Sequence, residues 1–183
     1  MELEARFEEV GGLAPVRGDH FMPVPENEIA DLEQTLEASL PDPYRNFLKT
    51  FGASRFRVMV EFKPVTNLPA SISDDGTGSI NIFYGASAHT PYDLAGEYEL
   101  YKDRMPEGFL PIGDDGGGDQ ICMLVAGEKA GGVYYWDHNS EWDEEDYTED
   151  GLAVPPDLKW QNVTLIAESF EDFVMRLSLW ETR

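Results

Sequence analysis

Three groups of residues have the chemical types that a binding or catalytic site needs, and all lie between positions 114 and 150. In the first, Asp114, Asp115 and Asp119 surround three consecutive glycines. Carboxylates in such a turn could hold a metal ion, or could cap the N–H groups of the turn itself. A phosphate-binding loop would need Lys and then Ser or Thr after the glycines, and neither follows. The pattern favours a structural turn built on Gly116, Gly117 and Gly118.

The second group, Asp137, His138 and Ser140, matches a hydrolytic triad in residue type only. Adjacent residues of an extended chain point to opposite faces, and the sequence contains no Gly-x-Ser-x-Gly turn. His20 and His89 lie far away along the chain, and no histidine has the spacing of a zinc site. We therefore predict no catalytic residue, no bound metal and no cofactor.

The third group is a run of eight acids in the fourteen positions 137 to 150, with no Lys or Arg among them. The run fails as an EF-hand, because Trp142 stands at the turn glycine and Thr148 at the terminal Glu. A basic protein partner or a plain solvated loop both explain it, and specific calcium binding is the weaker alternative. If a partner binds, the exposed acids supply charge and the aromatic residues supply anchors. The candidate contacts are Asp137, Trp142, Asp143, Glu144, Glu145, Asp146 and Tyr147, bordered by Asp114, Asp115 and Asp119.

The whole chain is also acidic, with 36 Asp and Glu against 13 Lys and Arg in 183 residues and a net charge of -23. Such a charge repels nucleic acid and anionic membranes and attracts basic proteins. Its alternative role is to keep the protein soluble. Of the basic residues, five fall between positions 45 and 63, where they form either a patch or, as we favour, internal ion pairs.

The cysteine count and the distribution of apolar residues indicate where in the cell the protein is located. The single cysteine, Cys122, lies in a strand pattern and suits a reducing compartment. The acidic start of the chain lacks the features of a signal peptide, and no run of apolar residues is long enough to span a membrane. We expect a soluble cytoplasmic protein.

The hydrophobic periodicity predicts helices at both ends of a set of strands. Ile29, Leu32, Leu36 and Leu40 form the stripe of one helix. A second helix follows from an N-cap at Asp42 to a stop at Gly52, with Tyr44, Phe47, Leu48 and Phe51 on its core face. A short helix is expected over 93–101. A C-terminal helix is expected from Ser169, with Phe170, Phe173, Val174 and Leu177 on one face and Trp180 as an extension.

Alternating or β-rich runs predict strands at 55–62, 80–84, 109–112, 121–125 and 133–137. In the first of these, Phe56, Val58, Val60 and Phe62 are expected to point to the same face. Helices before and after the strands, without regular alternation, indicate an α+β fold with a largely antiparallel sheet flanked by helices. We expect an N-terminal arm or short helix over 1–24, one domain over 25–183, and an acidic insertion, read as a polar loop, at about 139–157.

Four segments occur in an order that resembles the SUKH superfamily: LPDPYRNFLKTFGA (40–53), GFLPIGDDGGGDQICML (108–124), GVYYWDH (132–138) and IAESFEDFVMRL (166–177). That superfamily includes bacterial immunity proteins that neutralise polymorphic toxins and fungal regulators of cell-wall assembly. The resemblance covers about residues 26–180.

The resemblance implies a non-catalytic α+β domain that binds a cognate toxin, frequently a nuclease. The net charge suits this function, because nucleases need basic surfaces that an acidic inhibitor can cover. One alternative is a regulatory adaptor that has no toxin partner. Another is a metal-dependent enzyme that uses the Asp114 and Asp119 cluster.

Overall fold

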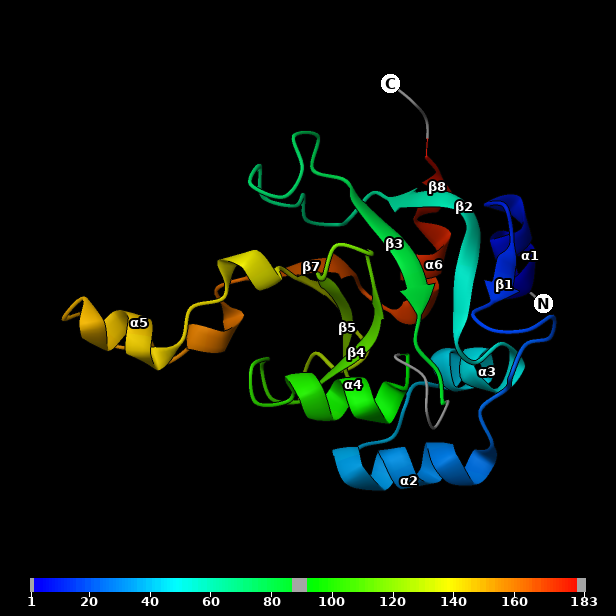
Figure 1. The fold of residues 1–183 in the computed structure, drawn as a ribbon, viewed down its shortest axis with the longest axis horizontal. Helices are drawn as coiled ribbons and strands as arrows, with labels where there is room; N and C mark the ends of the chain where they lie inside the picture. The colour runs from blue at the N-terminus through cyan, green and yellow to red at the C-terminus, as the bar shows by residue number, and fades with distance from the viewer. Residues whose placement is uncertain (1, 87–91, 181–183) are drawn as a thin grey trace.

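The computed structural model describes residues 2–86 and 92–180, which form one antiparallel sheet flanked by helices (Figure 1). The strands follow one another across the sheet from β1 to β7, and β8 pairs with β2. Their bounds are β1 (Leu13–Pro15), β2 (Ser54–Phe62), β3 (Gly78–Phe83), β4 (Phe109–Asp114), β5 (Gln120–Leu124), β6 (Val133–Trp136), β7 (Val163–Ala167) and β8 (Leu177–Leu179). The helices are α1 (Glu2–Glu9), α2 (Glu26–Leu36), α3 (Asp42–Thr50), α4 (Leu94–Tyr101), α5 (Glu144–Glu149) and α6 (Phe170–Met175). The predicted α+β class is confirmed.

Strand alternation divides the buried side chains between the two faces of the sheet. The larger core joins α1, α3 and α6 to one face, where Phe47 packs against Phe83 and Phe170 with ring centroids 4.8 and 5.4 Å apart. The smaller core lies on the other face around Cys122 and Trp136, beside Tyr101 of α4. Burial raises the pKa of the Cys122 thiol, so this cysteine acts as a small apolar residue, as predicted.

Helices α2 and α3 follow the predicted stripes. Ile29 and Leu32 of α2 are buried, and α3 buries Tyr44, Phe47 and Leu48. Helix α3 begins one residue earlier than predicted, because Pro41 occupies the N-cap position and Asp42 is already helical. Gly52 follows the helix with φ of 61°, a conformation that glycine adopts at little cost.

Two parts of the sheet differ from the prediction. The register between β2 and β3 shifts between Arg55 and Val60, so Val58 is 46% exposed although Phe56 and Val60 are buried. The C-terminal helix ends at Met175 because Leu177 pairs with Phe62 in β8, and Trp180 lies beyond that strand. The predicted Ser169 cap is present, since its hydroxyl accepts a hydrogen bond from the Asp172 amide.

Residues 2–24 contain α1 and β1, and both are built into the domain. Phe7 of α1 is buried against Phe47 and Phe83, and β1 pairs with β2. Within residues 45–63, Arg45 forms ion pairs with Glu26 and Glu33, and Lys49 pairs with Glu26. These contacts confirm internal ion pairing for those two basic residues.

None of the helices in the described ranges has both the length and the apolar character needed to span a bilayer. His89, which the sequence analysis considered as a metal ligand, lies outside the described residues.

Candidate partner-binding site

The strongest projection of negative charge is the connection between β6 and β7, which we call the acidic arm (residues 138–161). Figure 1 shows this segment extending away from the sheet, with α5 at its far end. The prediction of a polar loop for the first part of this segment is wrong. The segment contains a 3-10 turn at His138–Ser140 and the helix α5, followed by a second 3-10 turn at Leu158–Trp160.

Hydrogen bonds inside α5 explain why a helix forms there without an apolar stripe. The Asp143 carboxylate accepts from the Glu145 and Asp146 amides, and the Asp146 carboxylate accepts from the Asp143 amide. This reciprocal capping box satisfies the amides at the helix start, and acids in the first turn oppose the positive end of the helix dipole. Glu144, Glu145 and Asp146 are exposed, so the helix holds their charges in solvent.

The base of the arm is fastened to the sheet on both sides. The Asp137 amide donates to the Asn162 carbonyl at 3.0 Å, and the Asn162 side-chain amide donates to the Asp137 carbonyl at 2.8 Å. Arg104 binds Glu141 through two guanidinium nitrogens and lies over the Trp136 ring, 5.1 Å from its centroid. The hydrogen bonds that Arg104 donates to Glu141 raise the pKa of Arg104 above its ordinary value, so the guanidinium stays charged.

Aromatic residues accompany the charges of the arm. Trp142 is 46% exposed and its ring lies 5.5 Å from that of Tyr147. Gln161 holds the two together, since its amide donates to the Trp142 carbonyl and its oxygen accepts from the Tyr147 hydroxyl. The arm therefore presents carboxylates and a partly exposed aromatic pair on the same segment, the combination found at interfaces with basic proteins.

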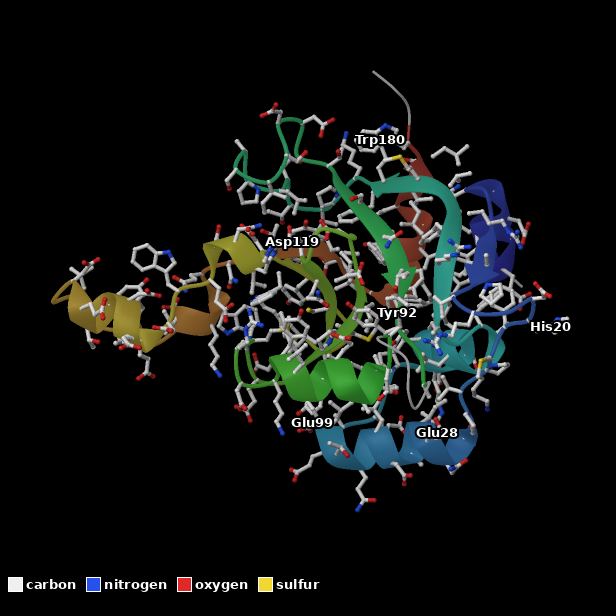
Figure 2. The ribbon with its side chains drawn as sticks, in the orientation of Figure 1. His20, Glu28, Tyr92, Glu99, Asp119 and Trp180 are labelled. Atoms are coloured by element: carbon white, nitrogen blue, oxygen red, sulfur yellow. The ribbon has the colours of Figure 1, made fainter. Side chains whose placement is uncertain are left out.

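The glycine-rich turn (residues 114–119) lies where the arm leaves the sheet, as the position of Asp119 shows (Figure 2). Its carboxylates mostly point inward. Asp115 accepts hydrogen bonds from the Gly117 and Asp119 amides and from the Tyr135 hydroxyl. Asp114 accepts from the Gly116 amide and from the Tyr84 hydroxyl. The turn has the backbone-capping role expected from its sequence.

Asp119 is the most engaged carboxylate of the turn. It is 7% exposed, and it accepts from the Tyr135 hydroxyl at 2.6 Å and from the His138 amide at 2.9 Å. The His138 Nδ1 lies 2.5 Å from the same carboxylate. Burial, followed by the hydrogen bond to Asp119, raises the pKa of Tyr135, so the hydroxyl remains a donor. Asp119 thus joins β5, β6 and the first residue of the arm.

Asp114 belongs to a second partly buried polar group beside α4. Burial raises the pKa of Asp114 above its ordinary value. Glu97 of α4 also has a raised pKa, first because of burial and then because of the charge on Asp114. The charge on Asp114 therefore favours the protonated form of Glu97.

Asp119, Asp137 and His138 offer ligand atoms within 4.8 Å of one another, a spacing compatible with a metal ion. Each carboxylate oxygen of the pair of acids already accepts a hydrogen bond. In Asp137, the Asn139 amide and the Ser140 hydroxyl occupy the two oxygens. Ser140 therefore bonds to Asp137 and His138 to Asp119, which is not the geometry of a triad. Hydrogen bonds therefore connect all three members of this cluster to neighbouring residues.

The predicted contact residues thus separate into two sets. Trp142, Asp143, Glu144, Glu145, Asp146 and Tyr147 come together on the exposed arm. Asp119 and Asp137 are 7% and 5% exposed and serve the structure of its base. Arg104 and Glu141 were missed as the pair that holds the arm, because 37 positions separate them in the chain. Trp160 was also missed. Its ring packs against Phe109 and Tyr134, at centroid distances of 5.2 and 5.9 Å, and joins the end of the arm to the sheet.

The comparisons with known proteins agree with this architecture. The model of the SMI1 / KNR4 family (SUKH-1) matches residues 23–176. The chain belongs to this SUKH family. Proteins of the SUKH family interact with partner proteins. The matched range begins just before α2 and includes the glycine-rich turn and the acidic arm.

The chain is also similar to a protein from a bacterial prophage. It is 29% identical over 160 residues to the SPbeta prophage-derived uncharacterized protein YokK of Bacillus subtilis (strain 168). The similarity covers 82% of this chain and 72% of YokK.

Proposed function

We propose that this protein is a non-catalytic, cytoplasmic immunity protein that binds and neutralises a basic toxin domain of the nuclease type. Family membership supports an immunity role, and the similarity to a prophage-derived protein supports a bacterial setting. The observation that carries the proposal is the acidic arm, which displays carboxylates away from the body of the molecule.

The charges of α5 are available to a partner. In the described part of the chain, Glu144, Glu145 and Asp146 form no ion pair with Lys or Arg, and no basic residue lies within the helix. A cationic surface would gain from meeting them, and the Trp142–Tyr147 pair would supply apolar contact area at the centre of the interface. Nucleases present such cationic surfaces to their own substrate.

Two further features support a binding role without catalysis. Asp114 and Asp119, the acids of the alternative metal-dependent enzyme, are occupied by hydrogen bonds to tyrosine and backbone donors. His138, Asp137 and Ser140 form separate contacts. These residues shape the base of the arm.

The test is co-purification with the product of the adjacent gene, followed by association kinetics at several salt concentrations. Charge-steered association slows as salt rises. The double variant Glu144→Lys, Glu145→Lys should lower the association rate by about tenfold at low salt, because both changes oppose a cationic partner. The matched control, Asp74→Lys with Glu107→Lys, makes the same change in net charge at exposed positions outside the arm.

An association rate that does not depend on salt, or equal losses in the two double variants, would contradict the role of the arm. Expression of the neighbouring protein should also arrest growth unless this chain is present. A stable complex with a partner that has no toxicity would favour the regulatory adaptor.

A further inference from the structure

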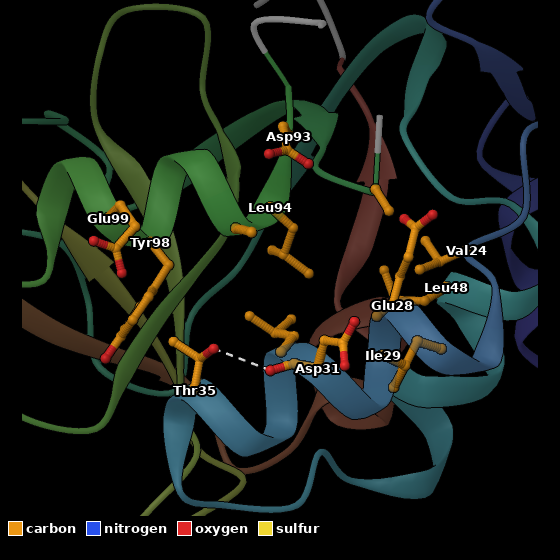
Figure 3. Close-up of a pocket in the computed structure, with 13 residues that line it drawn as sticks. Val24, Glu28, Ile29, Asp31, Thr35, Leu48, Asp93, Leu94, Tyr98 and Glu99 are labelled. Atoms are coloured by element: carbon orange, nitrogen blue, oxygen red, sulfur yellow. Dashed lines mark hydrogen bonds between the residues drawn. The ribbon is translucent and has the colours of Figure 1, made fainter. Parts of the chain in front are cut away.

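A groove lies between α2 and α4, on a different part of the surface from the acidic arm (Figures 1 and 3). Its volume is about 280 Å³. Apolar side chains form the floor: Val24, Ile29, Leu32, Leu48 and Leu94. All five belong to the main core. Ile29 and Leu48 are fully buried, so Val24, Leu32 and Leu94 supply the small apolar surface that reaches the groove.

Carboxylates surround this floor. Glu28 and Asp31 stand on α2, and Asp93 and Glu99 stand at α4 (Figure 3). The figure shows the α2 and α4 side chains facing each other across the opening. An apolar floor with an acidic edge is selective, because it rewards an apolar group that carries positive charge beside it.

The basic residues near the groove are already paired, one of them with a carboxylate of the groove's own edge. Arg45 and Lys49 bind Glu26 and, in the case of Arg45, also Glu33. On the α4 side, Lys102 binds Glu99 at 2.6 Å. Within the described ranges, Glu28 and Asp31 are exposed and have no cationic partner.

We propose that the groove receives an apolar side chain from a basic polypeptide segment, with flanking Lys or Arg side chains pairing with Glu28 and Asp31. This inference rests on the proposed function for the basic character of the partner and adds a second contact surface. A second copy of this chain is a poor occupant, because each copy carries a net charge of -23.

The groove can be tested without the toxin, using the full-length chain and a defined probe. The probe is the acetylated and amidated peptide Gly-Lys-Leu-Lys-Gly, titrated while the methyl NMR signals of Ile29, Leu32 and Leu94 are recorded. Binding should shift these methyl signals. The peptides Gly-Lys-Ser-Lys-Gly and Gly-Glu-Leu-Glu-Gly should bind at least about tenfold more weakly, since each lacks one half of the recognised chemistry.

Matched variants locate the binding. Ala95→Trp places a large ring over the groove from an exposed position, and Thr35→Trp does so from the opposite wall. Each should weaken the probe by at least about tenfold, whereas Leu100→Trp on the outer side of α4 should leave it unchanged. Glu28→Gln with Asp31→Asn should weaken it by about threefold, more than Glu144→Gln with Glu145→Gln, which removes the same charge from the arm.

Equal binding of the serine peptide, shifts confined to the acidic arm, or equal losses with Leu100→Trp would each overturn the groove proposal. If the probe binds at the groove but Ala95→Trp does not weaken a toxin complex, the groove binds basic apolar segments but the toxin does not use it. Loss of the toxin complex in the arm variant alone would support only the proposed function. The two proposals can therefore fail independently.

Discussion

The glycine-rich turn and helix α5 are both short acidic segments, yet they use their carboxylates in opposite ways. In the turn, Asp115 and Asp119 accept hydrogen bonds from tyrosine hydroxyls and backbone amides. In α5, Asp143 and Asp146 cap their own helix while Glu144 and Glu145 face solvent. The difference lies in the donors that the fold brings near, and it decides which acids are left for a partner.

The two regions should therefore respond differently to mutation. A buried carboxylate that satisfies several donors contributes to global stability, because its loss leaves those donors without acceptors. A capping carboxylate on an exposed projection affects mainly the local helix.

The largest effect is expected for Asp119→Ala, which removes the acceptor of the His138 amide and the shorter of the two hydrogen bonds of the Tyr135 hydroxyl. We expect a loss of about 3 kcal/mol in the free energy of unfolding, measured by urea denaturation. Asp143→Ala is the matched change on the arm and should cost less than about 0.5 kcal/mol in the same global measurement. Equal losses for the two variants would remove the distinction between the regions.

A smaller effect is expected within the glycines of the turn. Gly118 has φ of 112°, and an added Cβ would lie 3.0 Å from the His138 ring. Gly117 does not have positive φ, and its nearest neighbour would be the Asp115 carboxylate at 3.3 Å. Gly118→Ala should lower stability by about 1–2 kcal/mol, whereas Gly117→Ala should change it by less than about 1 kcal/mol. Thermal unfolding of both variants measures the contrast, and a reversed order would show that this backbone is not constrained as described.

The smallest effect concerns pH. The pKa of Glu97 is raised in the folded state from its ordinary 4.5, by burial and then by Asp114. The folded protein therefore binds this proton more tightly than the unfolded chain, and stability falls as pH rises above about 4.5. Glu97→Gln should raise the midpoint of thermal unfolding by about 1–2 °C at pH 7, after allowance for solvent screening, and should have no effect at pH 4.

Glu144→Gln is the matched control for this measurement, because that side chain is exposed on the acidic arm. This variant should leave unchanged the difference between the midpoints of thermal unfolding measured at pH 7 and at pH 4. If Glu144→Gln raised the unfolding midpoint more than Glu97→Gln did, this would contradict the half-buried position of Glu97 beside Asp114.

The sequence was sufficient for the elements that carry their own pattern. The stripes of α2 and α3, the short helix α4 and the central strands all follow from local spacing. It failed where partners distant in the chain decide the outcome. Val58 is exposed because β2 shifts register against β3, and Leu177 leaves the helical pattern because it pairs with Phe62.

The candidate site was predicted only in part, because contacts between residues distant in the chain also decide its structure. The exposed acids of α5 could be found from composition, but the helix itself could not, since its stability comes from the pairing of Asp143 with Asp146 rather than from an apolar stripe. The burial of Asp119 depends on Tyr135 and His138, 16 and 19 positions away. Charge alone does not distinguish an acid that faces a partner from one that supports the fold.

The hydrogen bonds between Asp137 and Asn162 separate the acidic arm from the rest of the sheet. Two hydrogen bonds join the residues that directly precede and follow the acidic arm. Because these bonds hold the two ends together, insertions, deletions or replacements within the acidic arm should leave the pairing of β6 with β7 in place. If the arm contacts the partner, as we propose, then exchange of residues 138–161 would change the partner that is bound while the sheet stays the same.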